Sequence, residues 1–384
     1  MPRYRMAFAV VKHFPFGGMQ RNMLRIAKAC AARGHEIDVY ASEWTGPEPK
    51  DLNIRVLKVR ALTNHGRNQK FSVALRKAIA PGGYDCVVGS NKMPDLHVYY
   101  AGDPCFAAAL ERSKPSICTW LPRYREYLRQ EAEVFDKDRD TDILLSAHEE
   151  QEKFIRYYAT DPSRFHRLPP GIDRHRLVAQ APSEREQRAL RKELGLKPED
   201  HMILSVGSSF RTKGVDRAIR AVASLPPTTR HKVRLVVVGQ GKFRVFARLA
   251  RRLGVGHQVV FAGPREDLAR YYYSADLLVH SAYSENTGNA LIEAMVCGLP
   301  VLTTAACGFA FHVVRADAGL VCPLPCTQEA LNSALLNMIT SDRRDTWREN
   351  GLAYCDQVDL YTMIDCATDV ILARAERNRT SKRN

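Results

Sequence analysis

The chain has 384 residues, of which 45% are hydrophobic and 26% charged, and this excludes a disordered, fibrous or disulfide-stapled protein. Its 57 basic and 42 acidic residues give a net charge of +15, which indicates an anionic partner without distinguishing nucleic acid, a phosphorylated substrate and acidic lipid. No segment approaches the roughly 20 apolar residues of a transmembrane helix, and the first residues lack the apolar region of a signal peptide. We therefore expect a cytoplasmic protein whose ten cysteines are reduced.

The first half of the chain alternates short apolar runs with helical stretches, a pattern typical of a parallel sheet covered by crossover helices. A helix is predicted over 18–33, because Gly34 follows it at the position that ends many helices. The strands of this half are predicted at 7–11, 36–40, 54–59, 84–89 and 142–146. These elements predict one α/β domain.

A second α/β series follows a break at Leu168–Ile172, where two prolines and a glycine interrupt the pattern. A charged helix is predicted over 183–192, and Val215–Leu225 repeats apolar residues on one helical face. The strands of this half are predicted at 202–206, 233–238, 259–262, 277–280 and 301–303. The fold class is therefore α/β, with two similar halves.

The last predicted helix, 363–377, has no strand after it, so we expect it to cross back onto the first half. The basic tail beyond it is expected to fray. The expected division is a first domain of residues 1–170 joined by 355–384, and a second domain of residues 171–354.

The most informative segment carries two glutamates, Glu285 and Glu293, after a predicted strand. A helix is predicted over 288–297, with Asn286 and Thr287 as candidate N-caps. Eight helical residues correspond to about 12 Å of rise and roughly 80° of rotation, too far for the two carboxyl groups to share a proton. In its loop Glu285 can instead accept sugar hydroxyls, and the backbone N–H groups at the helix start suit a phosphate. Either glutamate alone is also consistent with a solvated residue.

Two further loops have residues suited to phosphate. Gly17 and Gly18, between the first strand and the first helix, allow a close approach of the backbone, although a plain turn explains them equally well. Arg211 and Lys213 lie in a glycine-flanked loop after a strand, at the sheet edge where ligands of such folds bind. They could neutralise a diphosphate or simply be exposed.

The segment 112–129 interleaves aromatic and basic residues, which suits either an amphipathic element at an anionic membrane surface or a surface helix that packs its aromatics inward. No recognised nucleic-acid-binding module is present. The candidate membrane contacts are Trp120, Arg123, Tyr124, Arg125 and Arg129.

The Glu-x7-Glu segment, with the Gly-Leu-Pro that follows it, resembles the signature of retaining glycosyltransferase family 4, whose members adopt the two-domain GT-B fold. Further blocks, which span nearly the whole chain in order, resemble the branch of this family that glucosylates the bacterial lipopolysaccharide core. These blocks are Lys12–Arg21, Thr63–Asn68, Asn91–Pro94, Leu168–Ile172, Lys213–Arg217 and Asp359–Tyr361.

The resemblance implies a role for each candidate residue. Lys213 would neutralise the leaving phosphate, and Arg211 would substitute for the family's arginine, because Thr212 occupies one possible position of that arginine. Gly17 and Gly18 would lie against the donor pyrophosphate and sugar. Glu285 would bind the donor sugar together with Asn286, Thr287 and Gly288, and Glu293 would bind the ribose. The main chain of Phe261–Arg265, with Arg265, would bind the uracil. Asp103, after the strand end at Tyr99–Tyr100, would bind a sugar hydroxyl or the acceptor.

The resemblance also implies the reaction, which is retaining transfer of glucose from UDP-glucose to a heptose of the lipopolysaccharide inner core, at the cytoplasmic face of the inner membrane. UDP-galactose and UDP-N-acetylhexosamine are the alternative donors, and an RNA-binding protein or a sugar-nucleotide epimerase are alternatives of other classes. No metal and no nucleic acid are expected. The Asp-x-Asp patterns within Asp136–Asp142, which bind metal and diphosphate in the other major glycosyltransferase fold, are expected to form a solvated loop.

Overall fold

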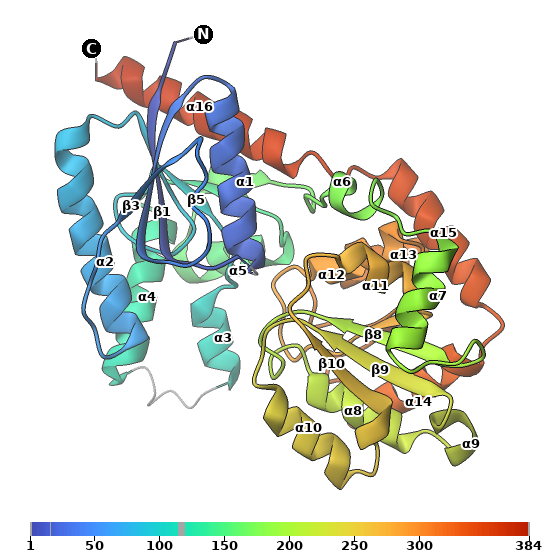
Figure 1. The fold of residues 1–384 in the computed structure, drawn as a ribbon. Coiled ribbons are helices and arrows are strands. Elements are labelled where there is room, and N and C mark those ends of the chain that lie inside the picture. Colours follow the sequence, from blue (N-terminus) through green and yellow to red (C-terminus); the bar gives the residue numbers. More distant parts are fainter. Residues whose placement is uncertain (1, 16, 114–119, 383–384) are drawn as a thin grey trace. The chain divides into compact units, whose positions relative to one another are not determined.

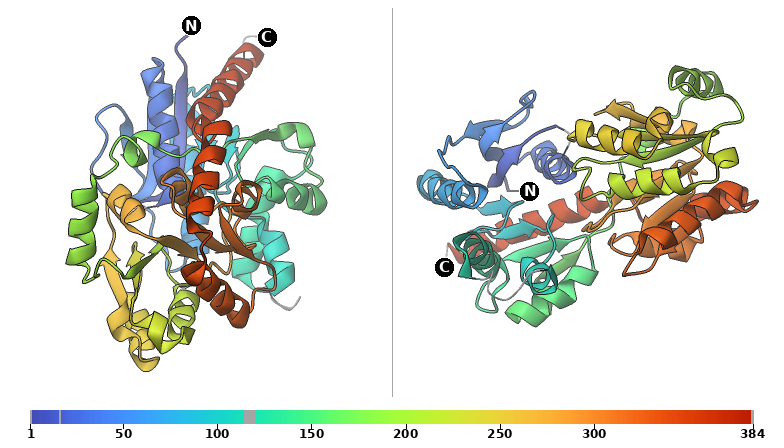
Figure 2. Two further views of the ribbon diagram at one scale, coloured as in Figure 1. Left: turned by 90° about the vertical axis from the view of Figure 1, so that its right-hand side faces the viewer. Right: turned by 90° about the horizontal axis from the view of Figure 1, so that it is seen from below.

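The computed structural model describes residues 2–15, 17–113 and 120–382. Its contacts divide the chain into two compact units, Met1–Pro169 with Thr362–Asn384, and Pro170–Tyr361, called here the N-terminal and C-terminal units (Figure 1). In each unit helices cover both faces of a parallel sheet, as two further views show (Figure 2).

The sheet of the N-terminal unit has the strand order β3-β2-β1-β4-β5-β6-β7 within the described residues. Its strands are β1 (Arg5–His13), β2 (Glu36–Trp44), β3 (Asn53–Val56), β4 (Cys86–Gly89), β5 (Val98–Tyr100), β6 (Asp142–Leu145) and β7 (Phe165–Arg167). Its helices are α1 (Gly18–Ala32), α2 (Asn64–Ile79), α3 (Phe106–Ser113), α4 (Pro122–Phe135), α5 (Glu149–Tyr158) and α16 (Met363–Ser381), with short 3-10 turns η1 (Ala80–Gly82) and η3 (Pro162–Arg164). Alternate residues of β1 face opposite cores, so that Met6 and Phe8 pack with α1 and α16 while Ala7 and Ala9 pack with α2, α4 and α5.

The sheet of the C-terminal unit has the order β10-β9-β8-β11-β12-β13 within the described residues. Its strands are β8 (His201–Val206), β9 (Val233–Val238), β10 (Val259–Gly263), β11 (Leu277–His280), β12 (Val301–Thr304) and β13 (Gly319–Cys322). Its helices are α6 (Arg174–Leu177), α7 (Glu184–Glu193), α8 (Val215–Ser224), α9 (Pro227–Arg230), α10 (Phe243–Arg252), α11 (Leu268–Ser274), α12 (Asn289–Val296), α13 (Ala310–Ala316), α14 (Gln328–Thr340) and α15 (Arg344–Gln357), with the 3-10 turn η4 (Gly256–Gln258). The strand order reverses direction between β8 and β11, and ligands of such sheets bind at the carboxyl ends of the strands on either side of that point.

The predicted strands are all present, with small shifts at their ends. Two strands that the sequence did not predict, β7 and β13, complete the two sheets at one edge. Both are short and only partly buried: β7 is three residues long with the sequence Phe-His-Arg, and β13 is apolar but only four residues long.

The chain returns to the N-terminal unit at Thr362, later than the expected 355, because Cys355 and Leu360 are buried in the core of the C-terminal unit. The prediction of a frayed tail was wrong for residues 377–382, and residues 383 and 384 lie outside the described part of the chain. Helix α16 continues to Ser381, and the Lys382 ammonium group beyond it donates to the Tyr84 carbonyl.

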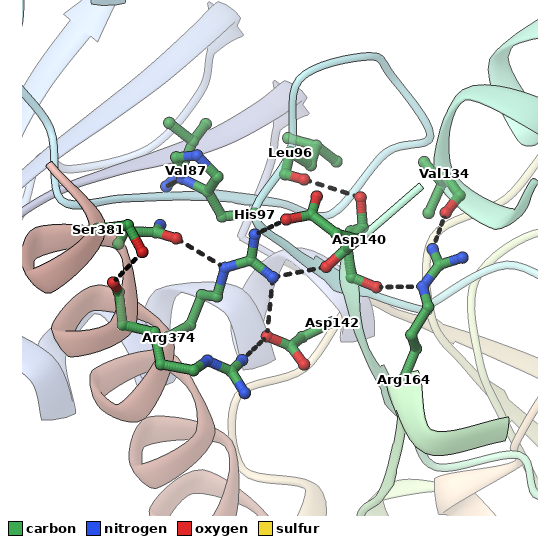
Figure 3. A network of polar contacts seen from close by, with 12 residues as sticks. Val87, Leu96, His97, Val134, Asp140, Asp142, Arg164, Arg374 and Ser381 are labelled. Carbon is green, nitrogen blue, oxygen red and sulfur yellow. Dashed lines mark hydrogen bonds and ion pairs between the residues drawn. The ribbon is translucent and has the colours of Figure 1, made fainter. Parts of the chain in front are cut away.

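An aspartate of the Asp-x-Asp run lies in a buried polar network rather than in a solvated loop (Figure 3). Asp142 begins β6 and is 5% exposed, and the guanidinium groups of Arg374 and Arg377 on α16 contact its carboxylate. Arg374 also binds Asp140, whose side chain is 86% exposed. Asp138 and Asp140 are thus both exposed, as expected. These contacts fix the last helix to the sheet.

Candidate active site

Three loops meet at the carboxyl edge of the C-terminal sheet, after β8, β11 and β12. The loop after β8 contacts the loop after β11 closely, since the Ser281 hydroxyl donates to the Gly214 carbonyl at 2.8 Å and the Tyr283 amide donates to the Thr212 carbonyl at 2.9 Å. Gly214 has φ +68°, and a Cβ there would lie 1.9 Å from the Ser281 oxygen. Glycine at this position is therefore required for the contact.

The contact of these loops brings two predicted site residues together. The Lys213 ammonium group touches the Glu285 carboxylate, and the two side chains are only 22% and 14% exposed. Lys213 also packs over Gly207, where a Cβ would lie 3.2 Å from its side chain. Burial lowers the pKa of Lys213 to about 8, and the nearby Cys307 has a smaller effect in the opposite direction.

A third residue at this pair, His280, was not identified from the sequence. It ends β11, is 1% exposed, and its Nε2 lies 3.5 Å from a Glu285 oxygen. Neither ring nitrogen has a hydrogen-bond partner among the described residues. Burial and the charge of Lys213 lower the pKa of His280 to about 3, so its ring is neutral at neutral pH. The only sequence signal was its position at the end of a strand beside the point where the strand order reverses.

The loop after β12 holds the Glu285 loop by main-chain hydrogen bonds. The Glu285 amide donates to the Ala306 carbonyl at 3.1 Å, the Gly308 amide donates to the Glu285 carbonyl at 3.2 Å, and the Phe309 amide donates to the Thr287 carbonyl at 2.7 Å. A Cβ on Gly308 would lie 2.1 Å from the Asn286 carbonyl oxygen. The backbone of the candidate sugar-binding loop is thus fixed on both sides.

The expected side-chain cap of the following helix is absent. Gly288, with φ +96°, is the N-cap of α12, and no side chain accepts from the first turn within the described chain. Neither Asn286 nor Thr287 therefore caps the helix, because the chain turns into it through a left-handed glycine. The Leu291 amide, in the first turn of α12, donates to the Gly288 carbonyl at 2.9 Å, whereas the amides of Asn289 and Ala290 precede any intrahelical acceptor.

Glu293 lies inside α12 and is 9% exposed, which is not the exposure of a solvated helical glutamate. The Tyr272 hydroxyl on α11 donates to its carboxylate at 2.8 Å. Glu285 contacts Lys213, whereas Glu293 accepts from Tyr272. That the two glutamates do not act as an acid–base pair stays a prediction.

Neither Arg211 nor Arg265 forms a hydrogen bond or ion pair with Glu285 or Glu293 in the described part of the chain. Both are exposed, and the Arg265 Nε donates to the Ala262 carbonyl at 3.0 Å. Arg211 lines a hollow of about 490 Å³ with Thr212, Asp216 and Tyr283. Arg211 and Lys213 are two residues apart in one loop, but Arg211 is exposed whereas Lys213 is partly buried.

The candidate residues of the N-terminal unit lie in its strand-end loops. Gly17, buried, is the N-cap of α1 without a side-chain cap, and Gly18 is exposed with no atom within 4 Å of a Cβ placed there. Asp103 is exposed after β5. The backbone at Gly18 is therefore open to a ligand.

The amphipathic segment is described from Trp120 onward, and residues 114–119 lie outside the described part of the chain. Trp120 is 79% exposed, and Arg123 and Arg125 are also exposed. Tyr124 instead stacks on Phe106 of α3, with ring centroids 6.2 Å apart. Arg129 is paired with Glu126 and Glu133, which reduces its availability for an anionic surface.

The described residues offer neither a membrane-spanning helix nor a cluster of metal ligands. No helix within 2–15, 17–113 and 120–382 combines the length and hydrophobicity of a transmembrane span. The same part of the chain holds no group of three or more His, Cys, Asp or Glu side chains that could coordinate a metal ion.

Comparisons with known proteins agree on one family. A model of group 1 glycosyl transferases matches residues 186–353, and a model of Glycosyltransferase Family 4 matches residues 16–176. The lipopolysaccharide glucosyltransferase WaaG of Escherichia coli (strain K12) is 42% identical, over 95% of this chain and 98% of that protein. The crystal structure of WaaG matches with a TM-score of 0.92 and 40% identity, covering 95% of this chain and 99% of the other. Anabaena Alr3699/HepE in complex with UDP-glucose, at 19% identity with coverage of 97% and 100%, matches with a TM-score of 0.73 and so shares the fold. The chain therefore belongs to family 4 of the GT-B glycosyltransferases, as a relative of the lipopolysaccharide glucosyltransferase WaaG.

Proposed function

We propose that this chain transfers glucose from UDP-glucose, with retention of the α configuration, to a heptose of the lipopolysaccharide inner core. The observation that carries the proposal is the buried contact of Lys213 with Glu285, where a cation and a hydroxyl-binding carboxylate share the ligand edge of the sheet. The extent of the similarity to WaaG supports the choice of glucose and lipopolysaccharide.

In the proposed reaction UDP leaves while the acceptor hydroxyl attacks on the same face of the sugar, and the β-phosphate takes the acceptor proton. Lys213 and Arg211 stabilise the charge that develops on the leaving diphosphate, with backbone N–H groups at Gly17 and Gly18. Glu285 and the amides of Asn286–Gly288 orient the sugar. Fixed groups of this kind lower the barrier because they are already in place when charge develops.

The remaining donor contacts follow the same proposal. Glu293, which accepts a hydrogen bond from Tyr272, would bind the ribose hydroxyls. The main chain at Arg265 would bind the uracil, and Asp103 would bind a hydroxyl of the sugar or of the acceptor. No metal is needed in this scheme because the protein's own cations neutralise the diphosphate.

We also propose that the chain docks on the anionic cytoplasmic face of the inner membrane. The exposed Trp120 with Arg123 and Arg125 supports this proposal, since each cation near an anionic leaflet contributes about 1 kcal/mol. Tyr124 packs against Phe106 and Arg129 is paired, so we assign them a smaller part in docking.

The test is a competition assay with lipopolysaccharide truncated at heptose and an equimolar mixture of UDP-glucose, UDP-galactose and their N-acetyl forms, in the presence of EDTA. We expect the mass of the product to increase by one hexose, identified as glucose by sugar analysis. Addition of galactose or an N-acetylhexosamine would overturn the assignment of UDP-glucose as the donor. Loss of activity in EDTA would overturn the metal-free scheme. No addition from any donor would overturn the proposed function.

A further inference from the structure

The surplus of positive charge is concentrated in one stretch of the C-terminal unit. Residues 217–265 hold eleven of the 57 lysines and arginines of the chain and none of its 42 acidic residues. The stretch includes α8, α9 and α10, and Figure 1 shows α10 beside α8 at the surface of this unit. Cations without acidic neighbours in the sequence are balanced either by contacts elsewhere in the fold or by an anionic partner.

The cations of α10 differ from others in the same stretch. Arg220 pairs with Asp216, and the Arg230 guanidinium donates to the Ala223 carbonyl at 3.0 Å. The basic side chains of α10, by contrast, form no hydrogen bond or ion pair within the described part of the chain. These exposed residues are Lys242, at the N-cap, and Arg244, Arg248, Arg251 and Arg252 of the helix. The fold therefore leaves five cations of one short segment without a neutralising contact.

Helix stability does not explain the charges of α10. Lys242 and Arg244 lie at its N-terminal end, where the helix dipole favours anions, and its first turn holds no acidic residue. Arg244 and Arg248 lie four residues apart, a spacing at which like charges repel. Helix α7 of the same unit, by contrast, has acidic residues in its first turn and pairs Arg188 with Glu184. Helix α10 thus carries its cations at a cost in stability that an anionic partner would offset.

The cations occupy the outer face of α10, and apolar side chains lie among them. Phe246 and Ala250 are buried and anchor the opposite face, with the Phe246 ring 5.7 Å from that of Phe210. At about 100° per residue, the four arginines point away from these two anchors. Val245, at the edge of the outer face, is 60% exposed, and Phe243 at the start of the helix is 51% exposed. The outer face is therefore a fixed surface that combines guanidinium groups with exposed apolar groups.

We propose that the outer face of α10 docks on an anionic lipid bilayer. Guanidinium groups bind phosphates through paired hydrogen bonds, and Val245 and Phe243 would enter the interfacial region between the headgroups. Nucleic acid would also neutralise the arginines, but an aliphatic side chain offers its bases neither stacking nor hydrogen bonds. This surface belongs to the C-terminal unit and is distinct from the docking segment 120–129. It goes beyond the proposed function, because it does not depend on which sugar is transferred.

The test is sedimentation of the full chain with vesicles made of equal parts of phosphatidylcholine and phosphatidylglycerol. The triple variant Arg244→Gln, Arg248→Gln and Arg251→Gln removes three charges of α10 and keeps a residue of high helix propensity at each position. Each cation near an anionic leaflet contributes about fivefold in affinity, so we expect this variant to bind about 10²-fold more weakly. Its melting temperature should not fall, since the substitutions relieve repulsion within the helix.

The matched control is the triple variant Arg185→Gln, Arg188→Gln and Lys192→Gln, which removes the same charge from exposed positions of α7. It should bind the anionic vesicles within about threefold of the wild type, because exposed cations with acidic neighbours contribute little.

An unchanged vesicle affinity in the α10 variant would overturn the proposal. Equal losses in both variants would assign the effect to net charge and overturn it too, as would a wild type that binds single-stranded RNA but not the vesicles. A loss accompanied by a lower melting temperature would show a structural role of the arginines and count against docking. Because no sugar is transferred in this assay, failure of the proposed glucosyl transfer would leave its result unchanged.

Discussion

Lys213 is a buried lysine whose only close anionic neighbour in the described chain is Glu285. A UDP-sugar diphosphate placed beside it would meet a cation that is already desolvated and positioned. Charge stabilisation is larger at such a site than in water, since the surroundings are of low polarity.

We expect Lys213→Ala to reduce turnover of UDP-glucose by about 10²-fold, as removal of other fixed electrostatic groups does. Steady-state kinetics with saturating acceptor measure this effect. Lys232→Ala, which removes the same charge from an exposed position of the same unit, should have wild-type turnover. Wild-type turnover in Lys213→Ala would rule out its assigned role.

The lowered pKa of Lys213 predicts a pH dependence. Because the ammonium form is the one that stabilises phosphate, and its pKa is about 8 in the free enzyme, kcat/KM for UDP-glucose should fall as the pH rises above about 8. Lys213→Arg should remove this alkaline decline at a lower overall rate, because guanidinium stays charged. An identical alkaline decline of kcat/KM in the arginine variant would show that a titratable group other than Lys213 causes it.

Glu293 should contribute to binding of the nucleotide rather than to the chemical step. We expect Glu293→Ala to weaken binding of UDP alone by at least about tenfold, the loss expected for hydrogen bonds to a charged group. Calorimetry with UDP measures it. The control Glu329→Ala changes an exposed glutamate at the start of α14 and should leave affinity unchanged. Unchanged UDP affinity in Glu293→Ala would remove the ribose role.

At the scale of elements, the site is built from main chain rather than from side-chain caps. The loops after β8 and β12 hold the Glu285 loop between them through the hydrogen bonds of Thr212, Ala306 and Gly308. These contacts fix the backbone that would bind the sugar. The position of Glu285 therefore depends on residues outside its own loop.

Gly308→Ala tests this support. A Cβ only 2.1 Å from the Asn286 carbonyl would displace the loop by the order of 1 Å, and such a displacement can cost about 10²-fold in rate. We expect this loss of turnover in steady-state assays. Gly195→Ala, at φ +75° with no atom within 4 Å of the added Cβ, strains the backbone away from the site and should keep activity. Equal losses in both variants would assign the effect to stability alone.

For the molecule as a whole, the return of the chain to the N-terminal unit depends on α16. Arg374 of this helix is 8% exposed and pairs with Asp142 of β6, which is 7% exposed at its side chain. Burial raises the pKa of Asp142, but the hydrogen bond from His166 and the charges of Arg377 and Arg374 outweigh it, so that the pKa is lowered. The carboxylate is thus charged and paired in the folded state.

We expect Arg374→Ala to destabilise the N-terminal unit by about 3 kcal/mol, because it leaves a buried carboxylate with fewer partners. Denaturant unfolding measures the change. Asp369→Ala, which breaks the exposed pair of α16 with Arg33, should cost no more than about 1 kcal/mol. A similar cost for both variants would contradict the importance assigned to burial.

The sequence predicted the two α/β halves, most strands and the loops that carry Lys213, Glu285 and Glu293. These features are local, since apolar period, glycine position and strand-to-loop order are readable within a few residues. The same local information failed for β7, because its sequence Phe-His-Arg contains no apolar run. It also failed for the tail after 377, because a basic helix is stabilised by partners elsewhere in the chain.

Only the tertiary structure decided which side chains share an environment. It placed His280 beside Glu285, gave Glu293 a tyrosine partner, and put Arg211 and Tyr283 at the lining of one hollow. It also buried Asp142 against α16, although its sequence context is that of an exposed loop. The physical reason is that burial and the distance between charges are set by the packing of segments far apart in the chain, which the sequence of any one segment does not contain.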